Sequence, residues 1–180
     1  MPAALILCGS ARKDGVTDMM CRSASETLES MGYETVVIRI TDDVSHCRDC
    51  GLCRGGGCVL DDAMSGIYGE FAKADLLVLA TPVHFSGPSS LIKTAVDRFQ
   101  PYWYDRDKSH PSAALGLVCA GSESPRFGPT ESIFRAFCAT VGMRWLGQLE
   151  FPDTDCNRGE GAAEAVEGFI RDVVGASAER

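Results

Sequence analysis

A ten-residue stretch near the N-terminus, Cys-Gly-Ser-Ala-Arg-Lys-Asp-Gly-Val-Thr at positions 8–17, carries residue types suited to holding an anion. It follows an uninterrupted apolar run and precedes a segment whose apolar residues recur at helical spacing. Backbone N–H groups, hydroxyls, cations and the positive end of a helix can therefore converge on one anion. The sequence predicts a phosphate-binding turn between a strand and a helix. The residues expected to line it are Ser10, Arg12, Lys13, Gly15, Val16 and Thr17.

Three better-known phosphate loops do not match this stretch. A dinucleotide fingerprint requires glycine where Ala11 stands, and a Walker loop requires lysine where Val16 stands. A low-molecular-weight phosphatase loop would place an arginine six residues after the cysteine, at the position of Asp14. The stretch therefore suits a phosphate that is held in place better than one that is transferred. The alternative is a turn without a ligand, in which Thr17 caps the helix.

Cysteine is unusually frequent in this chain, with nine residues in 180. Because thiols inside cells are normally kept reduced, metal or redox chemistry is favoured over a disulfide framework. Four of the cysteines fall within twelve residues, at Cys47, Cys50, Cys53 and Cys58. The others are expected to be small core or loop residues, namely Cys8, Cys21, Cys119, Cys138 and Cys156.

A second loop with chemical potential follows the most continuous apolar strand, at residues 74–80. If the first loop holds a phosphate, this loop is placed to hold the group attached to it. Exposed N–H groups there suit a flavin, whose reduction develops charge at ring nitrogens. His84 is a candidate acid or base, or else only a contact residue. The ring-contacting residues expected are Pro82, Val83, His84, Phe85, Ser86 and Gly87, with Ala120 and Gly121 of a third loop closing the other side.

The elements that position these loops alternate between strand and helix. Apolar runs predict strands at 2–7, 34–40, 74–80, 114–119 and 143–149, with helical periodicity after each one. We expect an α/β, flavodoxin-like three-layer sandwich with a five-stranded parallel sheet of order 2-1-3-4-5. The loops after strands one, three and four would then face one ligand. The cysteine-rich insertion, residues 46–60, is expected on the same edge.

Some shorter segments carry secondary expectations. Asp61-Asp62 is expected to cap a helix, and the pair Asp97 and Arg98 to fix a helix end. Residues 100–112 are expected to be irregular, and only the last few residues of the chain disordered. The run Tyr102-Trp103-Tyr104 either packs in the core or covers a flavin or a subunit interface.

Length and charge narrow the classes of protein. A chain of 180 residues suits one domain spanning 1–180, and its net charge of −8 argues against a nucleic-acid or anionic-membrane surface. No apolar run approaches the roughly 20 residues that cross a bilayer, and no signal-peptide pattern opens the sequence. We expect a cytoplasmic protein.

Taken together, these motifs resemble the NADPH-dependent FMN reductase family, and most of all its iron–sulfur flavoprotein branch. The resemblance covers roughly residues 3–150 and combines Gly-Ser-x-Arg-x-x-Gly-x-Thr, the cysteines followed by Asp-Asp-Ala-Met, Pro82-Val83 with Leu91-x-Lys93, and Asp97-Arg98. It implies bound FMN, with its phosphate on Ser10, Arg12 and Thr17 and its ring along Pro82, Val83, His84 and Phe85. The family often has tyrosine at the position of His84, so ring contacts differ here. A homodimer or homotetramer is also implied.

The cysteine spacing, C-x2-C-x2-C-x4-C, resembles the cluster motif of that branch. Cysteines three residues apart let a short coil curl around one [4Fe–4S] cubane, and the fourth returns after Gly55-Gly56-Gly57. Zinc is one alternative, although structural zinc sites more often separate two cysteine pairs by a longer loop. A metal-free loop is the other.

Three functions follow as hypotheses. The first is an FMN-dependent oxidoreductase that passes electrons between a [4Fe–4S] cluster on Cys47, Cys50, Cys53 and Cys58 and the flavin. Its donor would be a ferredoxin-like protein, and its acceptor a small molecule. The second is a cluster-free, NAD(P)H-dependent FMN or quinone reductase. The third is a non-enzymatic electron carrier.

Overall fold

The computed structural model describes residues 1–178 of the chain, so the disorder expected at the very end of the sequence concerns residues outside the described part. The strands are β1 (Ala3–Cys8), β2 (Glu34–Arg39), β3 (Leu76–His84), β4 (Gly87–Pro88), β5 (Ala113–Cys119) and β6 (Arg144–Phe151). The helices are α1 (Val16–Ser30), the 3-10 turn η1 (Leu52–Gly55), α2 (Met64–Phe71), α3 (Ser90–Asp97), α4 (Gln100–Tyr104), α5 (Gly128–Val141), α6 (Thr154–Asn157) and α7 (Ala162–Ala178).

The strands form one sheet of order β2-β1-β3-β5-β6, all parallel, and β4 pairs antiparallel with β3. This is the flavodoxin-like order that the sequence predicts, because β5 and β6 take the places of the expected fourth and fifth strands. The two-residue strand β4 was not predicted. Its turn carries phenylalanine and serine rather than the Asn-Gly or Asp-Gly pairs that mark a tight hairpin.

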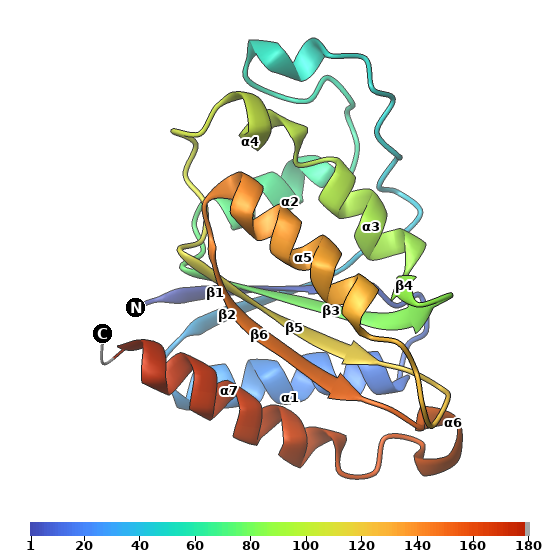
Figure 1. Cartoon of the computed structure of the whole chain (residues 1–180). Helices are drawn as coiled ribbons and strands as arrows, with labels where there is room; N and C mark the ends of the chain where they lie inside the picture. Colours follow the sequence, from blue (N-terminus) through green and yellow to red (C-terminus); the bar gives the residue numbers. More distant parts are fainter. Residues whose placement is uncertain (179–180) are drawn as a thin grey trace.

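Helices cover both faces of the sheet, giving three layers (Figure 1). Helices α1 and α7 lie on one face, and α2, α3, α4 and α5 lie on the other. Successive side chains of β1 pack on opposite faces of the sheet. Leu5 and Leu7 belong to one buried cluster, and Ile6 belongs to the other. All three side chains are fully buried, and each contributes about 1.5–3 kcal/mol relative to exposure. The continuous apolar pattern of β1 therefore reflects a strand covered on two sides.

Residues 100–104 form the short helix α4, which corrects the expectation of an irregular segment. Pro101 stands in its first turn, where the missing N–H has no helical partner to lose. Tyr102 is buried against Phe71 and Phe99, with ring centroids 5.1 and 5.6 Å away. By contrast, Trp103 is 54% exposed. Within the aromatic run, Tyr102 is therefore a core residue and Trp103 a surface residue. The packing of Tyr102, rather than an apolar periodicity, holds α4 in place.

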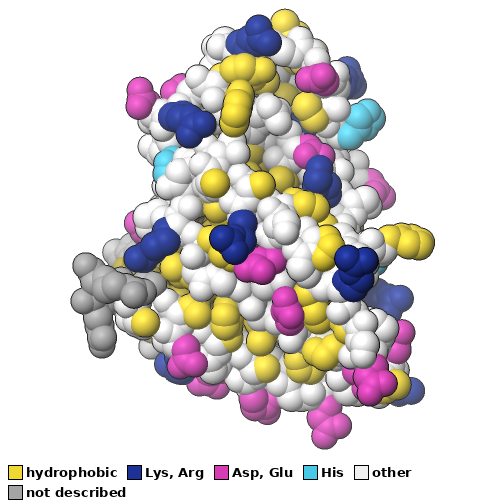
Figure 2. All heavy atoms as spheres, viewed as in Figure 1, with side chains coloured by type: hydrophobic (Ala, Val, Ile, Leu, Met, Phe, Trp, Pro, Cys, Tyr) yellow, Lys and Arg dark blue, Asp and Glu magenta, His cyan; other side chains and the backbone are white. Residues whose placement is uncertain are grey.

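The surface carries charges of both signs. On the face drawn in Figure 2, acidic side chains gather toward the lower edge, and basic side chains lie singly among neutral and acidic ones. Within residues 1–178 there is no helix with the length and apolar character needed to cross a membrane.

Candidate functional site

The loop predicted to bind phosphate connects the end of β1 to the start of α1, at the carboxyl edge of the sheet (Figure 1). Helix α1 begins after its N-cap residue, Gly15, which has no side chain to accept a hydrogen bond from the first turn. The N–H groups of its first turn thus lack the usual side-chain acceptor, and the positive end of the helix faces the loop. Such a helix start suits an anion such as a phosphate.

Thr17 does not cap this helix, contrary to the ligand-free alternative. It lies inside the first turn of α1, buried, and its hydroxyl is 3.2 Å from the thiol of Cys119 at the end of β5. Ser10 is also buried, and its hydroxyl oxygen accepts a hydrogen bond from the N–H of Arg12 at 3.2 Å. The side chains of Arg12 and Lys13 are exposed at the surface of the loop. The loop therefore offers buried hydroxyls and exposed cations.

Arg39, at the end of β2, holds the loop from beneath and was not predicted as a site residue. Its guanidinium donates hydrogen bonds to the carbonyl oxygens of Ser10, at 2.7 Å, and Arg12, at 3.1 Å. It also pairs with the carboxylate of Asp18, which Arg22 contacts at 2.9 Å. Two arginines thus offset the one acidic side chain in the first turn of α1. The available sequence signal was a cation at the carboxyl end of the strand next to β1.

Buried thiols lie directly below the loop. Cys8 ends β1 and Cys21 lies on α1, and both are almost fully buried. A hydrogen bond with the Cys21 thiol lowers the pKa of the Cys8 thiol to about 7, against the opposing effect of burial. For Cys119, burial raises the pKa of the thiol. As expected, the scattered cysteines fill the core, except for Cys156, which is exposed.

The phosphate loop is locked to the start of α3. The N–H of Gly9 donates to the carbonyl oxygen of Ala80 on β3 at 2.7 Å, and the Ser89 hydroxyl donates to the carbonyl oxygen of Gly9. Ser89 is the N-cap of α3, and its own N–H donates to the Thr81 hydroxyl at 2.9 Å. A Cβ atom on Gly9 would lie 2.6 Å from Cβ of Ile92, so only glycine allows this approach. The first and second predicted loops are therefore fixed against each other.

The second loop is a tight turn between β3 and β4. Phe85 and Ser86 occupy its two central positions with φ of +50° and +66°, and His84 pairs with Gly87 across the turn. Non-glycine residues adopt this left-handed region at a cost, which a surrounding structure has to offset. Phe85 is fully exposed and His84 is exposed as well. An exposed phenylalanine at a strained turn, beside the phosphate loop, suits contact with a planar ring.

In the third loop, at Ala120 and Gly121, less of the backbone is free to contact a ligand. Ala120 is buried, and its N–H donates to the carbonyl oxygen of Phe151 at 3.0 Å. The carboxylate of Asp155 on α6 lies over Gly121, so close that a Cβ atom there would be 2.5 Å from its Oδ2. The third loop is therefore partly covered by Asp155 of α6, a residue that was not predicted to lie at this site.

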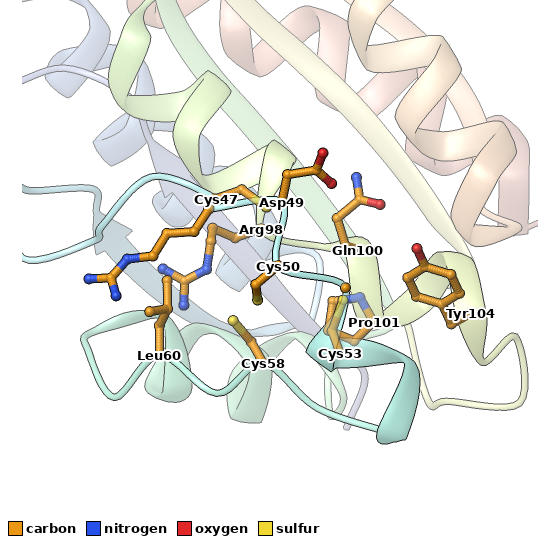
Figure 3. A pocket seen from close by; sticks show the side chains of 12 residues that line it. Cys47, Asp49, Cys50, Cys53, Cys58, Leu60, Arg98, Gln100, Pro101 and Tyr104 are labelled. Atoms are coloured by element: carbon orange, nitrogen blue, oxygen red, sulfur yellow. The ribbon is translucent and has the colours of Figure 1, made fainter.

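The four clustered cysteines do converge, but not where they were expected. Cys47, Cys50, Cys53 and Cys58 line one hollow together with Arg98, Pro101 and Tyr104, beside α4 (Figure 3). This is the C-terminal end of α3, whereas the phosphate loop contacts the N-terminal end at Ser89. The eight residues of α3 separate Ser89 from Arg98, nine steps or about 14 Å along the helix axis. The expected placement on one edge is therefore wrong.

The four thiols of this hollow are a donor set of the kind that binds a [4Fe–4S] cluster, but the structure does not bring them around one centre. Within residues 1–178, no three Cys, His, Asp or Glu side chains are grouped closely enough to hold one metal ion. A zinc ion needs its four ligands around one centre, whereas in a [4Fe–4S] cubane each thiolate binds a different iron. The hollow as a whole has a cavity volume of about 30 Å³, room for about two waters, so the loop has to widen around a cluster. Nothing lies within 4 Å of a Cβ atom built at Gly55, Gly56 or Gly57, so widening there displaces no neighbour.

A buried ion pair joins the two ends of the cysteine loop. Arg98 donates to both carboxylate oxygens of Asp62, at 2.6 and 3.1 Å, and to the carbonyl oxygen of Ser45 at 2.7 Å. The hydrogen bonds from Arg98 lower the pKa of Asp62 to about 2, although burial acts in the opposite direction. Asp62 also accepts from the N–H of Met64 at 3.0 Å, as expected for a helix start. Arg98 does not merely fix a helix end, as the sequence suggested; that expectation fits Asp97, which pairs with Lys93 on α3.

The strand order and the three layers define a flavodoxin-like protein, and comparison with known proteins narrows the class. The family model for NADPH-dependent FMN reductase matches residues 2–155. The chain belongs to this family, as its motifs indicated.

Relatives within this group include iron–sulfur flavoproteins. One from Methanocaldococcus jannaschii is 32% identical over 131 residues, covering 70% of this chain and 68% of that protein. One from Archaeoglobus fulgidus is 33% identical over 119 residues, covering 65% of this chain. The matched part is 54% of the Archaeoglobus protein, about half its length. Among solved structures, an NAD(P)H:quinone oxidoreductase from Methanothermobacter marburgensis has the same fold, with a TM-score of 0.73 and 14% identity over 94% of this chain and 96% of that one.

Proposed function

We propose that this protein is an FMN-dependent oxidoreductase in which electrons pass between FMN and a [4Fe–4S] cluster bound by Cys47, Cys50, Cys53 and Cys58. The convergence of these four thiols on one hollow is the observation that carries the cluster. Membership of the FMN reductase family and similarity to proteins named iron–sulfur flavoproteins support the pairing of the two groups. The donor is a ferredoxin-like protein or NAD(P)H, and the acceptor is a small molecule.

The flavin part of the proposal assigns a task to each loop. The FMN phosphate binds at the start of α1, held by Ser10, Arg12, Thr17 and the N–H groups that follow Gly15. Lys13 adds positive charge at the rim. The ring lies along Pro82 to Gly87, with Phe85 against it and His84 as a contact or proton donor. Ala120 and Gly121 border the opposite side. When bound, FMN supplies hydride and single-electron chemistry, and the protein holds and orients it.

A cluster-free NAD(P)H-dependent FMN or quinone reductase is the second candidate. Two observations favour it: no group of side chains within residues 1–178 is arranged to hold a metal ion, and the family model is that of an NADPH-dependent FMN reductase. In that case hydride passes directly from the nicotinamide to the flavin, and the cysteine loop is metal-free.

One preparation distinguishes the two candidates. Protein purified under strict anaerobiosis is analysed for FMN, iron and acid-labile sulfide, and its absorbance spectrum is recorded. Four irons and four sulfides per chain support the cluster, whereas FMN without iron supports the second candidate. Flavin bleaching by NAD(P)H alone, compared with bleaching by a reduced ferredoxin, then identifies the donor.

We also propose that the protein is a homodimer or homotetramer. Trp103 is exposed and lines a groove between α3, α4 and α5, and Tyr104 is exposed at the cysteine hollow. Aromatic side chains are common at subunit interfaces. Light scattering at micromolar concentration tests this, and a monomer contradicts it.

A further inference from the structure

Arg98 lies at the junction of α3 and α4 and is the most deeply buried charged side chain near the cysteine hollow, with only 1% of its surface exposed. Two of its three nitrogens have hydrogen-bond partners. Nη1 donates to the Ser45 carbonyl and to Asp62, and Nη2 donates to the other oxygen of Asp62. These contacts tie the segment before Cys47 to the segment after Cys58, and they account for one edge of the guanidinium only.

The third nitrogen, Nε, is buried and has no hydrogen-bond partner within residues 1–178. A buried donor without an acceptor costs about 1–3 kcal/mol, and for a charged group the cost is greater. The Arg98 side chain also lines the hollow that holds the four thiols, and Figure 3 shows it on the side where Cys47, Cys58 and Leu60 lie. An unpaired cationic N–H therefore borders a cluster of sulfur acceptors.

We propose that Arg98 is the residue that positions and tunes the metal centre: its Nε–H donates a hydrogen bond to a sulfur of the thiolate-bound cluster, on the Cys47 and Cys58 side. This inference rests on the proposed [4Fe–4S] cluster. The unpaired Nε–H lacks an acceptor, and a thiolate or a bridging sulfide is a negatively charged acceptor for it. Hydrogen bonds to sulfur and nearby positive charge stabilise the more negative, reduced cluster, so Arg98 raises its reduction potential.

The competing interpretation is that Arg98 only clamps the ends of the cysteine loop. The ion pair with Asp62 would suffice for that, and Nε would then have no task. The two interpretations differ in what happens to the cluster when Asp62 no longer pairs with arginine. A clamp is already weakened by Asp62→Asn, whereas a hydrogen bond from Nε disappears only when residue 98 itself changes.

The test compares Asp62→Asn with the double variant Arg98→Met and Asp62→Asn, both as full chains prepared anaerobically. The double variant removes both charges of the buried pair, whereas Asp62→Asn leaves the Arg98 cation without its anion, at a cost of several kcal/mol in stability. Iron and sulfide content, and the reduced fraction of the cluster at fixed applied potentials, are measured for each protein. We expect equal iron content and a roughly tenfold lower ratio of reduced to oxidised cluster in the double variant, equivalent to about 59 mV for a one-electron couple.

Arg48 provides the matched control, because it lines the same hollow but is exposed. Because solvent screens an exposed charge, Arg48→Gln should change the ratio of reduced to oxidised cluster much less than the double variant does. In Arg48→Gln protein labelled with arginine that carries 15N at Nε only, pulsed EPR of the reduced cluster should detect a 15N coupling. This measurement does not depend on folding of the double variant, and loss of the coupling in Arg98→Lys would assign it to Nε.

The outcomes separate the two proposals. Wild-type protein without iron overturns both the cluster and the role of Arg98. Iron-loaded wild type with no 15N coupling, or with the same potential in Asp62→Asn and the double variant, overturns the role of Arg98 alone. A lower potential together with the coupling supports both.

Discussion

The guanidinium of Arg39 donates a hydrogen bond to the backbone carbonyl of Ser10 at 2.7 Å, joining the end of β2 to the loop after β1. The same side chain reaches the carbonyl of Arg12 and the carboxylate of Asp18. One residue thereby fixes the backbone of the predicted phosphate loop and neutralises an acid near its anion. We therefore expect Arg39 to affect FMN binding by holding the loop in position, without contacting FMN itself.

Replacing Arg39 with methionine should weaken FMN binding. The loop loses two charge-assisted hydrogen bonds, and Asp18 loses a partly buried cation, so we expect Kd to rise at least tenfold, about 1.4 kcal/mol. Quenching of flavin fluorescence measures the affinity. Arg22→Met is the control, because Arg22 also pairs with Asp18 but is largely exposed and does not contact the loop backbone. Equal losses in the two variants would contradict a role for the loop contacts.

Arg12 tests the assignment of the loop to phosphate. Its side chain is exposed at the loop surface, so Arg12→Ala should leave the fold intact while removing one cation from the anion site. We expect FMN affinity to fall about tenfold, as for the loss of one charge-assisted hydrogen bond, with riboflavin affinity unchanged. Titration with both flavins measures the difference. Unchanged FMN affinity, or equal losses for both flavins, would show that the phosphate lies elsewhere.

Gly9 tests the contact between the phosphate loop and α3. A methyl group at this position would lie 2.6 Å from Cβ of Ile92 and 3.1 Å from the Ala80 carbonyl oxygen, both in the packed interior. Gly9→Ala should therefore lower the free energy of unfolding by about 1–3 kcal/mol, measured by urea denaturation. Gly55→Ala is the control, since nothing lies within 4 Å of its Cβ, and it should change stability by less than about 0.5 kcal/mol. Similar effects in the two variants would be inconsistent with the close packing of Gly9.

Local patterns predicted the sheet order, because continuous apolar runs such as 76–81 mark strands buried on both faces, and the strand order follows from alternation with helices. The hairpin at Phe85 and Ser86 was missed because neither residue type favours positive φ. The position of the cysteine hollow was missed for a different reason. It depends on the pairing of Asp62 with Arg98, 36 residues apart, and no local pattern reports such a contact. The roles assigned to individual loop residues remain predictions.

Acid should weaken the fold through Asp62. Its pKa is about 2 in the folded chain, against an ordinary value of 3.8, because Arg98 donates to it. Lowering of a carboxyl pKa on folding stabilises the fold above the unfolded value, here by about 2 kcal/mol, and this contribution is lost as pH falls from about 4 toward 2. The difference in unfolding free energy between wild type and Asp62→Asn should thus be greatest at pH 5–7 and about 2 kcal/mol smaller near pH 2. Urea denaturation across this range measures it, with Asp97→Asn, whose carboxylate is 46% exposed, as the control. A difference that does not vary with pH for Asp62→Asn would mean that its carboxyl ionises normally, and that the ion pair with Arg98 does not hold the cysteine loop closed.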